Sequence, residues 1–171
     1  MNAENINSYS FLKEYIFHEE LFENDGVKSV MKFPHHFYTP HPVYMEKALA
    51  AIDPFPKELK CFYEEIGYGF MHRKSEKINR LFDPVSLMMI NLLQEDFKYN
   101  KEIREEVAHY NIEKQLLFFQ SGSGKYVVID RTDNNGENAI YYRNHKLTDS
   151  LYEFICTYHK NKDWLEYVLD E

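Results

Sequence analysis

The segment Gly122-Ser123-Gly124-Lys125 contains the residue types with which many proteins bind phosphate. In such a loop a helix follows the lysine, so that backbone amides and the helix dipole face the anion. Here the residues from Tyr126 to Asp130 predict a strand instead, because they are mainly aromatic and β-branched. We therefore interpret the segment as a glycine turn that joins two strands of a hairpin.

Three histidines, His35, His36 and His41, lie close together in the sequence, and neutral imidazole is a common metal ligand. No cysteine or acid stands at an adjacent ligand spacing, and histidines in loops are more often solvated or hydrogen-bonded. The two cysteines, Cys61 and Cys156, lack a metal or redox spacing, and their apolar neighbours favour small core residues. We therefore predict no metal site and no cofactor.

Catalytic residues are equally hard to identify. No serine or cysteine lies in a recognised nucleophile motif with a base and an orienting group. Glu64 and Glu65 are a possible carboxylate pair, but consecutive residues of a helix point in different directions. We therefore predict a protein that is not an enzyme and has no catalytic residues.

The chain has 171 residues and a formal net charge of −8. Phosphate binding draws its affinity from clustered Lys and Arg, so this charge argues against nucleic acid as a direct ligand. It favours a protein partner with a basic surface, although many proteins are acidic for solubility alone. No apolar stretch approaches the roughly 18 residues of a membrane span, and the first residues lack the pattern of a secretory signal. We therefore expect a cytoplasmic protein without a membrane segment.

Acidic residues are concentrated at the start of the chain, where residues 1–25 hold −5 of the total net charge. We predict Glu19, Glu20 and Glu23 as partner-binding residues, because such charges increase the rate of association with a partner of opposite charge. The alternative is a solvated helix face whose apolar side packs on the core. Nothing in the sequence indicates the oligomeric state.

The elements that must position these residues begin with a predicted helix over Ile6–Phe22 and a predicted strand over Val27–Phe33. The segment Phe33–Pro42 contains three prolines, which exclude a regular helix and predict an extended or looped connection. A short helix is predicted over Val43–Ala51. We expect the main domain to begin at this helix.

Two further helices have clear start and stop signals. The first begins near Pro56 and ends at Gly67, which we expect in the left-handed conformation. The second begins at Asp83 and Pro84, a cap followed by a residue that suits the first turn. The apolar spacing predicts that this second helix buries the face formed by Val85, Met88, Met89, Leu92 and Leu93.

In the last third of the chain the spacing of apolar residues changes from that of helices to that of short strands. A more exposed helix is predicted around residues 103–107, and the strands follow after it. Three short runs separated by Gly-rich or Asn-rich turns predict an antiparallel meander over Leu116–Phe119, Tyr126–Ile129 and Ala139–Tyr142. Ser150 and Glu153 match the spacing of a capping box for the next helix, and Asp163 starts a short final one.

Several of these segments together resemble the SUKH superfamily. The run Phe55–Phe70 is similar to its opening signature, a proline followed by an amphipathic helix that ends in G-x-G and an apolar residue. Asn79–Pro84 resembles the central turn into a helix, Leu116–Asp130 the strand, glycine turn and strand, and Asp149–Ile155 the closing S-x-x-E-F helix. The resemblance covers about residues 43–159, although Lys125 stands where Asp or Asn is common.

This resemblance implies an α+β fold in which helices flank a mixed or antiparallel sheet. Residues 1–42 then form an N-terminal helix, strand and Pro/His-rich connection, and residues 43–171 form a SUKH-like domain with a C-terminal helical tail. The family has no shared catalytic residues. Its bacterial members often serve as immunity proteins that neutralise toxins, frequently nucleases, by direct binding. The alternatives are a regulatory or scaffold protein of the Smi/Knr type and, more remotely, an enzyme or small-ligand binder.

Overall fold

A computed structural model of the protein describes residues 8–17, 33–73 and 77–170. Within these ranges a seven-stranded sheet forms the centre of the fold, and its strands lie side by side in chain order with every neighbouring pair antiparallel. The predicted α+β class is confirmed. The strands are β1 His36–Tyr38, β2 Tyr68–Met71, β3 Asn79–Leu81, β4 Gln115–Gln120, β5 Tyr126–Asp130, β6 Ile140–Tyr142 and β7 His145–Thr148.

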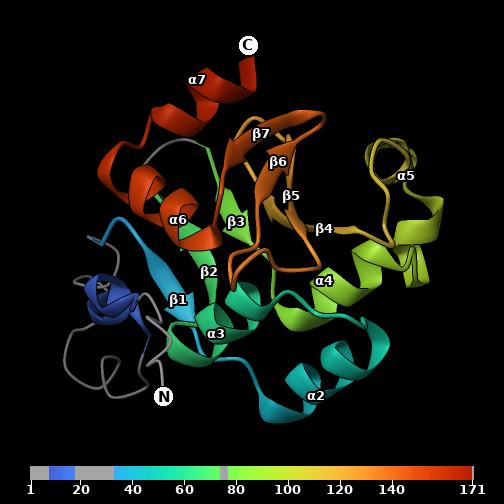
Figure 1. Cartoon of the computed structure of the whole chain (residues 1–171), viewed down its shortest axis with the longest axis horizontal. Helices are drawn as coiled ribbons and strands as arrows, with labels where there is room; N and C mark the ends of the chain where they lie inside the picture. Colours follow the sequence, from blue (N-terminus) through green and yellow to red (C-terminus); the bar gives the residue numbers. More distant parts are fainter. Residues whose placement is uncertain (1–7, 18–32, 74–76, 171) are drawn as a thin grey trace.

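Helices surround this sheet (Figure 1). Two of them, α6 and α7, lie on one side of the sheet in this view, α4 and α5 lie on the other, and α2 and α3 lie below. Among the described residues no helix combines the length and the apolar character needed to cross a membrane. The helices are η1 Ser10–Tyr15, α2 Pro42–Ala51, α3 Lys57–Glu65, α4 Pro84–Asn91, η3 Glu95–Tyr99, α5 Lys101–Ala108, α6 Leu151–Lys160 and α7 Trp164–Asp170.

The N-terminal helix is shorter than the predicted Ile6–Phe22. In the described residues it is the 3₁₀ helix η1, and the chain becomes extended at Ile16, which forms a parallel bridge with Phe37. The amide of Phe17 donates to the carbonyl of Phe37 at 2.7 Å, so strand-like pairing replaces further helical turns. Residues 6, 7 and 18–22 lie outside the described residues, and so does the predicted strand over residues 27–33 apart from Phe33, which is not in a strand.

The proline-rich segment contains β1, an edge strand that lies between Pro34 and Pro40. The extended conformation that the prolines predict is therefore confirmed, with three residues recruited into the sheet. Strand β1 lies very close to the backbone at the start of β2. A Cβ atom added to Gly67 or Gly69 would lie 2.1 Å from a carbonyl oxygen of β1. Gly67 has a φ of +116°, the positive value that its position at the helix end predicted. Division of the chain at residue 42 stays a prediction.

Local capping signals set most of the helix starts. Asp83 caps α4 by accepting a hydrogen bond from the amide of Ser86 at 2.9 Å. Ser150 caps α6 by accepting from the amide of Glu153 at 3.0 Å, as the capping-box spacing predicted. The predicted helices over 43–51, after Pro56, around 103–107 and after Asp163 are confirmed.

The buried face of α4 differs from the predicted one. Its core residues are Leu87, Ile90 and Asn91, whereas Leu92 is exposed and the other predicted face residues are only half-buried. Nearly every residue of α4 is apolar, so the spacing of apolar residues could not select a face. Asn91 is fully buried because its side chain bonds both backbone groups of Leu117, at the irregularity in β4.

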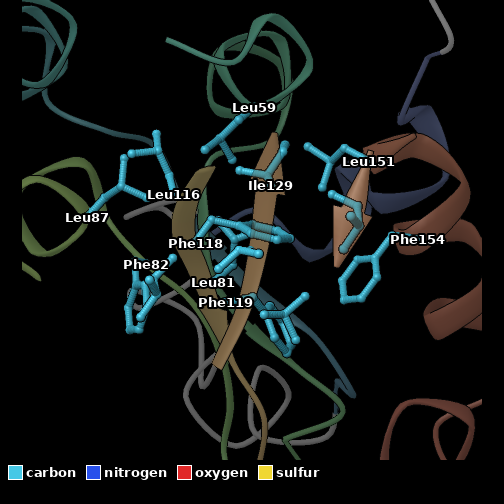
Figure 2. Close-up of a cluster of buried hydrophobic side chains, with 14 of the residues drawn as sticks. Leu59, Leu81, Phe82, Leu87, Leu116, Phe118, Phe119, Ile129, Leu151 and Phe154 are labelled. Atoms are coloured by element: carbon cyan, nitrogen blue, oxygen red, sulfur yellow. The ribbon is translucent and has the colours of Figure 1, made fainter. Parts of the chain in front are cut away.

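The core lies between the sheet and the helices (Figure 2). Phe118 and Phe119 of β4 meet Phe154 of α6 with ring centroids 5.8 and 5.6 Å apart, and all three side chains are fully buried. Leu59 of α3 and Ile129 of β5 extend the same cluster. Burying a large apolar side chain contributes about 1.5–3 kcal/mol, so this cluster fixes α3 and α6 on the sheet.

A half-buried carboxylate also joins these two helices. Glu58 of α3 accepts hydrogen bonds from the amides of Leu151 and Tyr152 in the first turn of α6, at 3.0 and 3.3 Å. It accepts a third from the amide of Asn138 at 2.6 Å. Burial raises the pKa of Glu58, and these three bonds oppose that rise. The negative charge lies where the N-terminus of α6 stabilises it.

Candidate functional site

A groove lies between the β6–β7 hairpin and helix α7, and we call it the α7 groove. Its volume is about 590 Å³, within the range of sites that bind ligands or peptide side chains. One wall comes from the hairpin and the other from α7, and the apolar lining includes Trp164, Val168 and Leu169 of that helix. The hairpin supplies Tyr142, Arg143 and Lys146.

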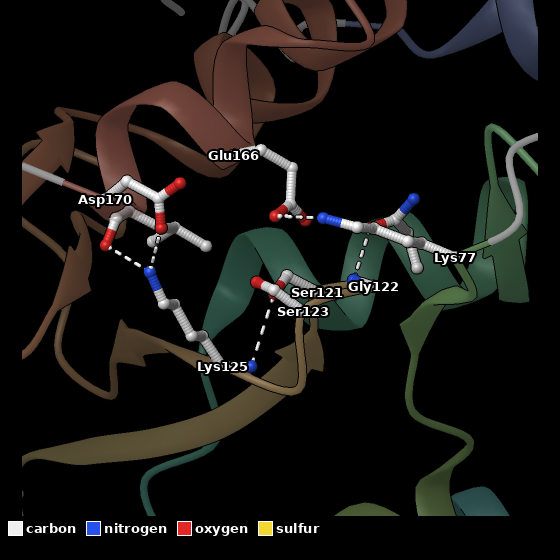
Figure 3. A network of polar contacts seen from close by, with 9 residues as sticks. Lys77, Ser121, Gly122, Ser123, Lys125, Glu166 and Asp170 are labelled. Atoms are coloured by element: carbon white, nitrogen blue, oxygen red, sulfur yellow. Dashed lines mark hydrogen bonds and ion pairs between the residues drawn. The ribbon is translucent and has the colours of Figure 1, made fainter.

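The lysine of the glycine turn holds the end of α7 over this groove (Figure 3). Lys125 Nζ donates to the carbonyl of Leu169 at 2.7 Å and to the carboxylate of Asp170. A cation at the last carbonyls of a helix is favourable because the helix dipole is negative there. The ion pair lowers the pKa of Asp170 through the hydrogen bond and through the charge of the lysine.

The glycine turn itself is a hairpin, as predicted. Gly124 has a φ of +82°, and Gly122 donates its amide to Asn79 Oδ1 at 2.7 Å. A Cβ atom at Gly122 would lie 2.1 Å from the Cβ of Lys77, so only glycine allows these two loops to meet. Lys77 in turn pairs with Glu166 of α7 at 3.2 Å. The residues that resemble a phosphate loop therefore anchor the final helix.

The cations of the α7 groove differ in their partners. Lys146 pairs with Asp149, an interaction that raises the pKa of Lys146. The guanidinium of Arg143 lies 5.4 Å from the ring centroid of Tyr142 and has no carboxylate partner among residues 8–17, 33–73 and 77–170. Our reading of the sequence missed these residues, although the basic run from Arg143 to Lys146 is unusual in a chain with a net charge of −8.

The three predicted histidines do not form one cluster. His41 caps α2, where its Nδ1 accepts from the amide of Val43 at 3.3 Å. His36 is buried and contacts the carbonyl of Phe33. His35 instead meets two histidines that are distant in sequence, His72 and His159.

The hydrogen bonds of His35 explain this cluster without a metal. Its Nδ1 accepts the amide of His72 at 3.1 Å, so the ring proton lies on Nε2, which donates to Nδ1 of His159 at 3.0 Å. Burial, together with the neighbouring histidines, lowers the pKa of His35 to about 3. Within the described part of the chain, no group of three or more His, Cys, Asp or Glu residues is arranged to hold a metal ion.

The remaining candidates for chemistry are the two cysteines and the two adjacent carboxylates. Cys61 and Cys156 are free and half-buried. Glu64 lies 3.8 Å from Lys60 on its own helix, whereas Glu65 accepts hydrogen bonds from the hydroxyl of Ser8 and the amide of Tyr9. The two adjacent carboxylates therefore face different surroundings and do not act as a pair.

The predicted partner-binding residues Glu19, Glu20 and Glu23 lie outside the described residues. The described residues that precede and follow this segment contact each other. The ring of Tyr15 packs against Phe33 and His35, with centroids 5.8 and 4.9 Å away.

Comparison with known proteins adds an independent finding. The model of the SMI1/KNR4 family (SUKH-1) matches residues 45–160, a span that begins within α2 and ends with α6. The immunity protein YxxD of Bacillus subtilis (strain 168) is 33% identical over 116 residues, which make up 68% of this chain and 77% of that protein. No solved structure matches the chain.

Proposed function

Because the chain belongs to the SMI1/KNR4 family (SUKH-1), we propose that it is an immunity protein that neutralises a cognate toxin by binding it directly. The observation that carries this proposal is the 33% identity to an immunity protein of Bacillus subtilis over two thirds of the chain. The span that the family model matches contains the strands from β2 to β7, most of α2 and the helices from α3 to α6. The family match and the alignment with the relative therefore each cover about two thirds of the chain and not a short motif.

The mechanism that we propose is occlusion of the toxin without chemistry, metal or cofactor. A protein that binds a partner without rearrangement needs a rigid surface. The packing of Phe118 and Phe119 on Phe154 holds α6 on the sheet, and the hydrogen bonds of Glu58 join α3 to α6, so the surface of these elements is rigid. The net charge of −8 complements a basic surface, such as the nucleic-acid-binding face of a nuclease toxin, and does not suit direct binding to nucleic acid. We propose that this neutralisation takes place in the cytoplasm and away from any membrane.

Glu19, Glu20 and Glu23 stay our proposed contacts for such a basic toxin. They belong to the N-terminal part of the chain, outside the family match, where features specific to one partner can be added to a shared scaffold. The flanking residues support this role, since η1 and β1 attach both ends of the segment to the body of the protein.

Co-expression tests the proposal. A candidate toxin domain, chosen from the genes beside that of this chain, is produced in a sensitive host with and without this protein, and growth is recorded. Rescue of growth, together with co-purification of the two proteins, is the expected result. Growth arrest that persists despite soluble immunity protein would instead favour the regulatory or scaffold role.

A further inference from the structure

The α7 groove is a basic site on an acidic protein. Lys125, Arg143 and Lys146 line it against one carboxylate, that of Asp170, whereas the whole chain carries −8. A cluster of one sign in a concave surface concentrates the field and attracts groups of the opposite sign. The charge of the groove is thus opposite to that of the protein.

One of the three cations holds the end of α7, and the other two are exposed and can bind a ligand. Lys125 is committed to the end of α7, and its side chain is only 27% exposed. Lys146 keeps an exposed pairing with Asp149, with side chains 48% and 71% exposed, and such surface pairs contribute at most about 1 kcal/mol and exchange partners readily. Arg143 is exposed, and its guanidinium lies 5.4 Å from the ring centroid of Tyr142. A planar guanidinium can bind a carboxylate in bidentate fashion.

The apolar wall gives the groove a second binding element. Trp164 is half-buried and packs on Phe154 with ring centroids 5.7 Å apart, so the core restrains a ring that also lines the groove. Val168 and Tyr142 continue this wall. Aromatic and arginine side chains in a pocket are the residues that contribute most to protein interfaces.

The groove also lies at the boundary of the family match. Its hairpin wall falls within residues 45–160, whereas α7 begins at Trp164, beyond the matched span. A shared scaffold and an added helix together create the site. This arrangement suits recognition of one particular partner.

We propose that the α7 groove receives an acidic peptide segment of the toxin, with its carboxylates on Arg143 and Lys146 and an apolar side chain against Trp164. The inference rests on the proposed function and adds a second contact of opposite polarity to the acidic N-terminal segment. Two surfaces of opposite charge fix the orientation of a partner better than one. A peptide is favoured over nucleic acid because the overall charge of −8 repels a polyanion of high charge density.

Charge reversal in the full chain tests this site. The variant Arg143→Glu/Lys146→Glu is compared with Lys98→Glu/Lys101→Glu, which changes the net charge equally on η3 and α5 at two residues that do not line the groove. Affinity for the toxin domain should fall at least about tenfold in the groove variant and stay within about twofold of the wild type in the control. The single variant Arg143→Glu repeats the test if the double variant melts early.

The outcomes separate the two proposals. A wild-type chain that does not bind the toxin would overturn the proposed function and this inference together. Equal, tight binding by the wild type and both double variants would overturn the groove while leaving the immunity role intact.

A titration with simple peptides gives a direct readout at the groove, because Trp164 is the only tryptophan of the chain. A short polyglutamate peptide at low ionic strength should change its fluorescence, and a short polylysine peptide should not. A stronger response to a short single-stranded oligonucleotide, lost in the groove variant, would show a nucleic-acid site and overturn the peptide assignment.

Discussion

Gly67 and Gly124 form a matched pair that tests how β1 is held. Both have positive φ, +116° and +82°, so alanine at either position has an unfavourable backbone conformation that costs about 1 kcal/mol or somewhat more. Nothing lies within 4 Å of a Cβ atom added at Gly124, whereas one added at Gly67 would lie 2.1 Å from the carbonyl oxygen of Tyr38. The two substitutions differ mainly in that collision.

The collision must move β1, because the clashing atom belongs to the backbone. The pair Tyr38↔Tyr68 is the end of a ladder of only three residue pairs, so a shift there removes a large share of the β1 contacts. We expect Gly67→Ala to lower the free energy of unfolding by about 3 kcal/mol and Gly124→Ala by about 1 kcal/mol. For a chain of this size the difference corresponds to about 4–8 °C in melting temperature.

Thermal and urea unfolding of both variants measure this difference directly. Amide exchange should also show lost protection in β1 for Gly67→Ala and unchanged protection there for Gly124→Ala. Equal destabilisation by the two substitutions would refute the close approach of β1 to Gly67.

Three further predictions concern the cluster of His35, the Glu58 bonds and the acidic N-terminal segment. Because burial lowers the pKa of His35 from 6.5 to about 3, the unfolded chain binds its proton first, and stability should fall as pH drops from about 6.5 toward 3. At pH 5 the loss from His35 reaches at most about 2 kcal/mol, and His35→Gln should reduce the pH dependence of urea unfolding; an unchanged pH slope would contradict this reading. Glu58→Ala should cost about 1–3 kcal/mol, because three partly buried amides lose their acceptor, and Glu64→Ala on the exposed face should cost less than about 0.5 kcal/mol in the same melts. Similar costs for the two variants would argue against a capping role for Glu58. Reversal of Glu19, Glu20 and Glu23 to Lys should slow association with a basic toxin at low salt while the melting temperature stays unchanged; unaltered association kinetics would remove these residues from the interface.

Features that depend on a few neighbouring residues could be predicted from the sequence. Asp83 and Ser150 cap their helices as the spacing indicated, and the turn at Gly124 lies between two strands as expected. Each of these signals acts through backbone geometry within a few residues. The strands β2, β3 and β7 were not predicted, because runs of three or four residues carry too little periodicity.

Features that depend on tertiary packing could not be predicted in the same way. The side chain of His35 bonds residues that are 37 and 124 positions away, so only the fold brings them together. Because apolar residues occur on all sides of α4, the sequence does not show which face is buried. The hydrogen bond between the buried Asn91 and Leu117 of β4 fixes that orientation in the fold. The α7 groove depends on an ion pair between Lys125 and Asp170, which lie 45 positions apart. The sequence shows only the basic run from Arg143 to Lys146 and not the groove that it lines.

Titration of toxin activity against the amount of this protein tests the central claim most directly. Neutralisation by binding predicts that activity falls linearly, reaches zero at a fixed molar ratio and does not change further with time. Loss of activity that continues with time at a small fraction of that ratio would show turnover and contradict a role by binding alone.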